Sequence, residues 1–105
     1  MQVENITEES ELDELLAEPG KLVVECYADW CAPCQDMEAR IEKWASQYIN
    51  VKFVKVNVDE ADELAEIFCI ESIPTFIFYE NGQEVFKQVD GDAQILKDEI
   101  KKFCK

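Results

Sequence analysis

The stretch LVVECYADWCAPC, residues 22–34, decides the fold. Its apolar run Leu22-Val23-Val24 opens a segment with apolar side chains on both faces, which predicts a central β-strand over residues 22–27. After Cys34, apolar side chains recur at helical spacing, which predicts a core-facing helix over residues 34–49. The stripe of this helix consists of Met37, Ile41, Trp44, Ala45 and Tyr48. Cys31 and Cys34 therefore lie where a strand gives way to a helix.

This position matters because a helix start can activate a thiol. The first backbone N–H groups of a helix have no partner within the helix, and the helix dipole adds partial positive charge there. Both effects favour a thiolate over a thiol. We expect Cys31 at that end, with Cys34 one turn further in. The pattern therefore predicts a redox-active pair that alternates between dithiol and disulfide.

Other uses of two cysteines at this spacing are disfavoured. A tetrahedral zinc site needs four ligands, but the chain contains no histidine and Cys26, Cys69 and Cys104 stand singly, so we expect no metal. A purely structural disulfide would close too short a loop to stabilise the fold much. Outside the pair, we expect Cys26 to be a small core side chain and Cys69 and Cys104 to be inert thiols.

Length and charge limit the class of protein and its partners. A chain of 105 residues predicts one domain, residues 1–105. Its 24 acidic and 10 basic side chains give a net charge of −14, which excludes nucleic acid and anionic membranes as expected partners. No segment has membrane-spanning length, and the acidic first twenty residues do not resemble a secretory signal. Five cysteines in such a chain indicate a reducing compartment, so we expect cytosol.

The remaining elements follow from periodicity and turn signals. Thr7 is the expected N-cap of a first helix that carries Leu12, Leu15 and Leu16 and ends at Pro19-Gly20. Asp59 is the expected cap of a third helix, and Asp92 that of the last. Strands are predicted over 51–58, 75–80 and 84–89, with a hairpin turn at Asn81-Gly82.

The resulting order is β-α-β-α-β-α-β-β-α, in which the first strand has no assigned range. Helices between strands predict parallel pairs with right-handed crossovers, and the hairpin adds an antiparallel edge. The sequence thus predicts an α/β protein whose mixed sheet has helices on both faces.

The chain resembles the thioredoxin family over essentially its whole length. The residues that carry the resemblance are Ala28-Asp29, Trp30-Cys31-Ala32-Pro33-Cys34, Lys55-Val56-Asn57-Val58-Asp59, Ile73-Pro74-Thr75, Asn81-Gly82 and Gly91. The resemblance implies the thioredoxin fold, a central mixed five-stranded sheet flanked by four helices. It assigns attack on a target disulfide to Cys31, resolution of the mixed disulfide to Cys34, and a cis bond facing the active site to Pro74.

Further site residues follow from the same resemblance. The expected substrate-binding residues are Trp30, Ala32, Pro33, Ile73, Pro74 and Gly91, although Trp30 read by itself also fits a core position. Physical reasoning adds that Cys31 should be exposed, because it attacks outside targets, and that Cys34 should be shielded. Pro33 fixes φ at the helix start and has no N–H to leave unpaired.

Glu25 is the clearest departure from the family, which usually has a buried Asp at this position to exchange protons with the second cysteine. Burial would raise the pKa of Glu25 toward neutrality, and Lys55 would lower it again. The resemblance therefore places Glu25 and Lys55 with the catalytic residues. The alternative reading is a strand residue paired with Lys55 for charge balance.

Other departures add negative charge around the cysteines. Ala32 replaces the usual Gly, Gln35 and Asp36 stand where the family often has Lys, and Asp90 and Asp92 flank Gly91. Negative charge near Cys31 opposes its thiolate and favours targets with basic rims.

The resemblance implies a monomeric cytosolic disulfide reductase that transports electrons and needs no bound cofactor. Its implied partners are a thioredoxin reductase, which would pass electrons from NADPH, and target proteins such as peroxiredoxins and ribonucleotide reductase. Two alternatives remain at this point: a binding or adaptor module with the same fold, and a disulfide oxidase or isomerase. The latter would need an oxidising compartment and usually has a different dipeptide between the cysteines, often with a histidine, which this chain lacks.

Overall fold

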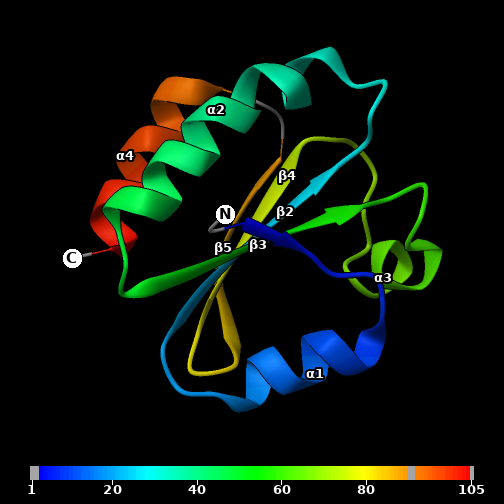
Figure 1. Ribbon diagram of the computed structural model, residues 1–105, viewed down its shortest axis with the longest axis horizontal. Helices are drawn as coiled ribbons and strands as arrows, with labels where there is room; N and C mark the ends of the chain where they lie inside the picture. The colour runs from blue at the N-terminus through cyan, green and yellow to red at the C-terminus, as the bar shows by residue number, and fades with distance from the viewer. Residues whose placement is uncertain (1–2, 90–91, 105) are drawn as a thin grey trace.

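The computed structural model describes residues 3–89 and 92–104. Five strands and four helices follow one another along these residues (Figure 1). They are β1 (Val3–Asn5), α1 (Glu9–Ala17), β2 (Lys21–Tyr27), α2 (Ala32–Gln47), β3 (Val51–Asn57), α3 (Asp62–Ile67), β4 (Thr75–Glu80), β5 (Gln83–Val89) and α4 (Ala93–Phe103). The predicted element order is confirmed, and the strand without an assigned range is β1.

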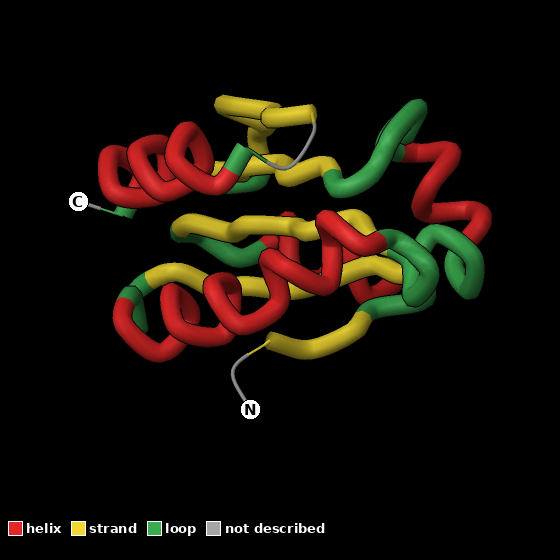
Figure 2. The backbone as a smooth tube through the Cα atoms, turned by 90° about the horizontal axis from the view of Figure 1, so that it is seen from above, coloured by secondary structure: helices red, strands yellow, loops and turns green. Residues whose placement is uncertain are grey.

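The strands form one mixed sheet in the order β1-β3-β2-β4-β5. The pairs β1–β3 and β2–β3 are parallel, whereas β2–β4 and β4–β5 are antiparallel. Figure 2 shows the strands side by side, from the β1 edge near the N-terminus to the β5 edge. The central strand is β2, as its apolar run predicts, so the segment that leads into Cys31 is the most enclosed part of the sheet.

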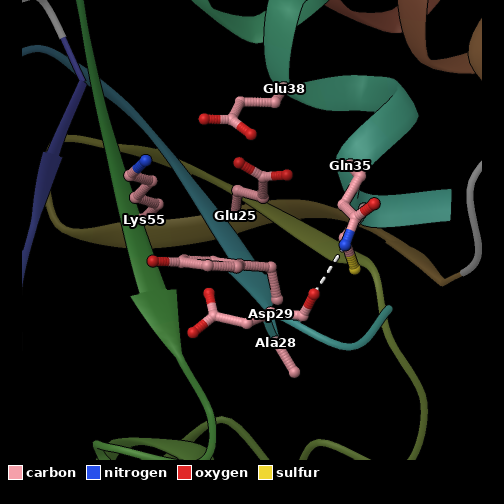
Figure 3. A pocket seen from close by; sticks show the side chains of 8 residues that line it. Glu25, Ala28, Asp29, Gln35, Glu38 and Lys55 are labelled. Carbon is pink, nitrogen blue, oxygen red and sulfur yellow. Dashed lines mark hydrogen bonds between the residues drawn. The ribbon is translucent and has the colours of Figure 1, made fainter. Parts of the chain in front are cut away.

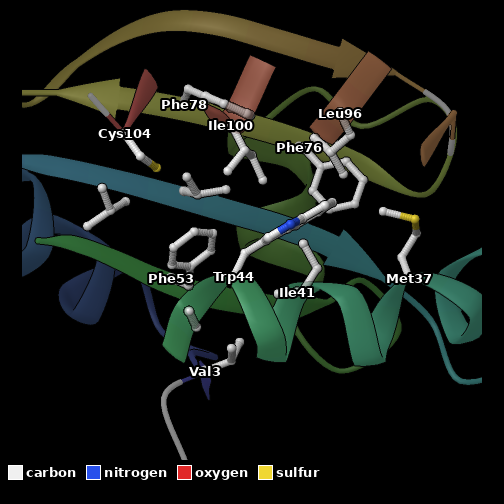
Figure 4. Close-up of a cluster of buried hydrophobic side chains, with 13 residues drawn as sticks. Val3, Met37, Ile41, Trp44, Phe53, Phe76, Phe78, Leu96, Ile100 and Cys104 are labelled. Carbon is white, nitrogen blue, oxygen red and sulfur yellow. The ribbon is translucent and has the colours of Figure 1, made fainter. Parts of the chain in front are cut away.

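Helices cover both faces of the sheet, with α2 and α4 on one side and α1 and α3 on the other (Figure 1). The core between the sheet and α2 and α4 holds large buried side chains from both layers (Figure 4). They include Val23, Phe53, Phe76 and Phe78 from the strands and Met37, Ile41, Trp44, Leu96 and Ile100 from the helices. Because side chains alternate along a strand, Glu25 points to the same face as Val23, under α2.

Two of the three predicted helix caps are wrong. The N-cap of α1 is Glu8 rather than Thr7, and the Glu11 carboxylate accepts hydrogen bonds from the N–H groups of Thr7 at 3.0 Å and Glu8 at 3.1 Å. The N-cap of α3 is Ala61 rather than Asp59. In both cases the N-cap lies one or two residues after the side chain that residue preference favours as a cap, so residue type alone does not locate the helix start.

The Asp92 cap of α4 is confirmed, because its carboxylate accepts hydrogen bonds from the N–H groups of Gln94 and Ile95, both at 3.0 Å. The hairpin turn at Asn81-Gly82 is confirmed as well, with positive φ at both residues. Within residues 3–89 and 92–104, no helix combines the length and the apolar character needed to cross a bilayer.

Candidate active site

Cys31 and Cys34 are joined by a disulfide at the start of α2. Cys31 is the N-cap of this helix, and its Sγ accepts a hydrogen bond from the Cys34 N–H at 3.2 Å. Ala32 and Pro33 form the first turn and are exposed. The predicted place of the pair at a helix N-terminus is confirmed. A helix N-terminus is a place where a thiolate is favoured over a thiol.

Both cysteines are buried in the disulfide form, and each residue is only 4% exposed. They pack with Ala28 in a small cluster against which Tyr27, Val58 and Ile73 lie. The prediction that Cys31 is exposed is therefore wrong for this form. The reason is tertiary: the segments before β4 and after β2 close over the sulfur atoms, and no local pattern reveals that.

Trp30 is 71% exposed, so the reading that places it in the core is wrong. Its Nε1–H donates a hydrogen bond to the Asp59 carboxylate at 2.8 Å. Asp59 thus holds an aromatic side chain in place instead of capping α3. The indole forms a fixed apolar surface next to the disulfide.

The Ile73–Pro74 peptide bond is cis, as the resemblance implies. Ile73 packs against the cluster of Cys31, Cys34 and Ala28, and Pro74 is buried immediately before β4. This segment therefore lies beside the disulfide, although it is some forty positions further along the chain. The predicted site residue Gly91, like Asp90, lies outside the described residues.

Glu25 lies in the middle of β2 and is 4% exposed. Burial raises the pKa of Glu25 from its ordinary value of 4.5 to about 7, although Lys55 lowers it. Glu38 and Glu42 raise the pKa further through charge repulsion. The directions of the effects of burial and of Lys55 are those expected from the sequence.

Lys55 is the register partner of Glu25 on β3. Its Nζ lies 5.4 Å from the centroid of the Tyr27 ring, in a cation–π contact. Among the described residues, Glu25 and Lys55 make no direct ion pair. Lys55 therefore acts on Glu25 through space and leaves its carboxyl group free to titrate.

A pocket of about 400 Å³ joins Glu25 to the second cysteine (Figure 3). Its lining consists of Glu25, Tyr27, Ala28, Asp29, Cys34, Gln35, Glu38 and Lys55. The Gln35 side chain donates a hydrogen bond to the Asp29 carbonyl at 2.6 Å and so ties α2 to the loop after β2. The pocket gives water a route between a titratable carboxyl group and Cys34.

The thioredoxin family model matches residues 2–105. The chain belongs to the thioredoxin family. It is 39% identical to the thioredoxin of Mycoplasmoides gallisepticum over 103 residues, which cover 98% of this chain and 100% of that one. Thioredoxins are thiol-disulfide oxidoreductases, and the Cys31–Cys34 disulfide is the corresponding couple in this family member.

Solved structures agree with this membership. A thioredoxin of Plasmodium falciparum superposes with a TM-score of 0.90 at 32% identity, over 95% of this chain and 98% of that one. A chain from a study of the thiol resolving mechanism in yeast mitochondrial 1-Cys peroxiredoxin, via glutathione/thioredoxin systems, also gives 0.90, at 31% identity over 95% and 94%. The thioredoxin fold is therefore shown.

The other cysteines of this thioredoxin family member lie away from the disulfide cluster. Cys26 is buried in β2, and burial raises the pKa of its thiol to about 12, which fits a core side chain. Burial likewise raises the pKa of Cys104 to about 11, whereas Cys69 is exposed. Within residues 3–89 and 92–104, no three metal-binding side chains gather at one place.

Sequence reasoning missed Glu38, which lines the pocket together with Glu25 and Cys34. One signal was available: Glu38 follows Cys34 by four positions, which places both on the same side of a helix. That helix spacing alone did not indicate Glu25 as a neighbour, because Glu25 comes from a different element.

Proposed function

We propose that this protein reduces disulfides in other proteins, with Cys31 as the nucleophile and Cys34 as the resolving thiol. The observation that carries this proposal is the hydrogen bond from the Cys34 N–H to the Cys31 sulfur at the start of α2. In the reduced protein the Cys31 thiolate attacks a target disulfide, forms a mixed disulfide and releases one target thiol. The Cys34 thiol then loses its proton and attacks the Cys31 sulfur. The second target thiol leaves, two electrons have passed to the target, and Cys31–Cys34 is oxidised.

Glu25 is proposed as the group that takes the proton from Cys34. A carboxyl group with a pKa of about 7 is charged in part of the molecules at neutral pH, so it can both accept and return a proton. Glu25 and Cys34 line the same pocket, which supports transfer through water. Lys55 is proposed to keep the pKa of Glu25 from rising further.

The target-binding surface is proposed to comprise Trp30, Ala32, Pro33, Ile73, Pro74 and Gly91. Trp30, Ala32 and Pro33 are exposed beside the buried sulfur atoms, so a target must approach over them. Asp29, Asp36 and Asp59 are exposed around the same place. Their charge favours targets with a basic rim.

Electrons are proposed to come from NADPH through a thioredoxin reductase. The protein is proposed to need no bound cofactor. It is further proposed to be a cytosolic monomer with one domain over residues 1–105. Proposed targets are peroxiredoxins and ribonucleotide reductase. Support for the first class comes from the structural likeness to the chain studied with a yeast peroxiredoxin. The net charge of −14 argues against nucleic acid and membrane partners.

The first experiment is equilibration of the Cys31–Cys34 couple with glutathione buffers of known ratio, with Cys31→Ser as the control. A reductase has a potential well below that of the glutathione pool. A potential near or above the pool would instead indicate an oxidase or isomerase. If no exchangeable couple exists, only a binding module with this fold remains.

A second experiment separates the roles of the two cysteines. Cys34→Ser should accumulate a mixed disulfide with a protein target, because the resolving thiol is absent. Cys31→Ser should accumulate none, because the helix N–H group that favours a thiolate is directed at the Cys31 sulfur, while Cys34 lies further inside α2. Mixed disulfides formed equally by both variants would contradict the assignment.

A further inference from the structure

Glu25 is cut off from solvent, which raises the question of how it exchanges its proton. The question rests on the proposed proton role of Glu25. At 4% exposure, its carboxyl group has almost no direct contact with bulk water. Each oxidation of the dithiol loads Glu25 with one proton, which it either returns to Cys34 on re-reduction or exchanges with the medium. A group at the pocket wall that also borders the solvent can connect Glu25 to bulk water.

Most of the pocket wall cannot pass a proton on. The Lys55 ammonium group is a donor without acceptor capacity, and the Gln35 amide is not an acid or base at neutral pH. The Tyr27 hydroxyl group already donates a hydrogen bond to Asn5 at 3.0 Å. Two carboxylates of the lining remain, Asp29 and Glu38.

The two carboxylates differ in where they point. In Figure 3 the carboxyl group of Glu38 faces that of Glu25, whereas the carboxyl group of Asp29 points away from it. Glu38 is also exposed at its position on α2, so its other side is in contact with water. It thus borders both the pocket and the solvent. Cys34 lies on the same helix, so α2 fixes the spacing between Glu38 and Cys34.

We propose that Glu38 carries the proton between Glu25 and solvent. When Cys34 is deprotonated, Glu25 takes the proton. Glu25 then passes it, directly or through a pocket water, to the Glu38 carboxylate, which releases it to the medium. When the disulfide is reduced again, the same steps run in reverse and return a proton to Cys34. Glu38 is a positioning residue for this proton, since it acts through Glu25 and touches neither sulfur.

The charges around Glu25 require a control, because Glu38 affects it by repulsion as well. The charged and titratable groups around Glu25 are Lys55 and Tyr27 from the sheet, Asp29 from the loop after β2, and Glu38 and Glu42 from α2. Glu38 and Glu42 both raise the pKa of Glu25, but only Glu38 lines the pocket. Removing either charge should therefore lower the pKa of Glu25, more strongly for Glu38 than for Glu42, while only the removal of Glu38 breaks the route.

The experiment measures turnover of insulin disulfides with dithiothreitol as electron source, in dilute and in concentrated imidazole buffer. We expect Glu38→Gln to be several-fold slower than wild type in dilute buffer and to recover as imidazole takes over the proton transfer. Glu38→Asp should keep most of the rate. Any change of rate in Glu42→Gln should be the same in both buffers, because it comes from charge alone.

Two results would overturn the proposal. One is an unchanged rate in Glu38→Gln; the other is an equal loss in Glu38→Gln and Glu42→Gln that imidazole does not repair, since charge alone would then explain it. The variant Glu25→Gln distinguishes a failure of the Glu38 proposal from a failure of the proposed role of Glu25. A slow Glu25→Gln with a normal Glu38→Gln removes only the role of Glu38. A Glu25→Gln with wild-type rate and pH profile removes the role of Glu25, and that of Glu38 with it.

Discussion

Glu25 and Lys55 are register partners on two adjacent parallel strands, and the Lys55 ammonium group lies over the Tyr27 ring instead of on the carboxylate. The cation is thus held near Glu25 by an aromatic face. Its field lowers the pKa of Glu25, while burial and two glutamates raise it, and the balance is about 7. A buried carboxyl group stays titratable at physiological pH because no direct partner fixes its charge.

Lys55→Met should raise the pKa of Glu25 above 7, because the positive charge that lowers it is lost while burial stays. We expect the midpoint of the Glu25 titration, followed by carboxyl ¹³C NMR, to move to higher pH. The pH profile of disulfide reduction should move the same way. Lys52→Met, which removes a cation paired with Glu4 on the surface, is the matched control. A midpoint that stays in place would contradict the through-space effect of Lys55.

Glu25→Gln should make stability less dependent on pH. The pKa of Glu25 is raised in the folded state, from 4.5 to about 7, so its contribution is fully present below pH 4.5 and is lost as pH rises through 7. Between these limits the wild type should lose about 3 kcal/mol relative to the variant. Urea unfolding of both proteins at pH 4.5 and pH 8.5 measures this difference. Parallel pH dependences in the two proteins would show that the carboxyl group titrates normally.

The hydrogen bond between Trp30 and Asp59 predicts a binding effect. Asp59→Ala leaves the indole N–H without its acceptor, so the exposed ring is no longer held in one orientation. We expect KM for a protein disulfide to rise roughly fivefold, equivalent to about 1 kcal/mol, with little change in kcat. Asp59→Asn keeps an acceptor oxygen and should remain close to wild type. A change in kcat alone would argue against a role of Trp30 in target binding.

Asp36 tests the effect of acidic charge on the nucleophile. It is exposed in the second turn of α2, two positions after Cys34. Asp36→Lys replaces a charge that opposes the Cys31 thiolate by one that favours it, so alkylation of the reduced protein by iodoacetamide at pH 7 should be a few-fold faster. Asp13→Lys changes the net charge equally but lies on α1, on the opposite face of the sheet. Equal acceleration by both variants would mean that only net charge matters.

Periodic segments were predictable from sequence, and contacts between distant segments were not. The strand over 22–27 and the helix from 34 to 49 agree with β2 and α2 within two residues, since both depend on regular burial. A three-residue strand such as β1 is too short to show a period. The sequence predicts Asp59 as a helix cap, whereas in the structure its carboxylate accepts a hydrogen bond from Trp30. That contact exists only in the folded chain and leaves no local pattern. The burial of Cys31 and the place of Glu38 opposite Glu25 likewise depend on side chains from separate elements.

The Cys31–Cys34 disulfide is enclosed, and this affects the rate of thiol-disulfide exchange but not directly the reduction potential. A potential is set by the relative stability of the two redox forms, whereas a rate depends on access to sulfur. Ala32 and Pro33 are exposed beside the buried sulfur atoms and limit access by a small thiol, whereas the proposed docking of a target on Trp30 would bring its disulfide close to them. We therefore expect the enclosed disulfide to exchange more slowly with small thiols than its potential alone would suggest.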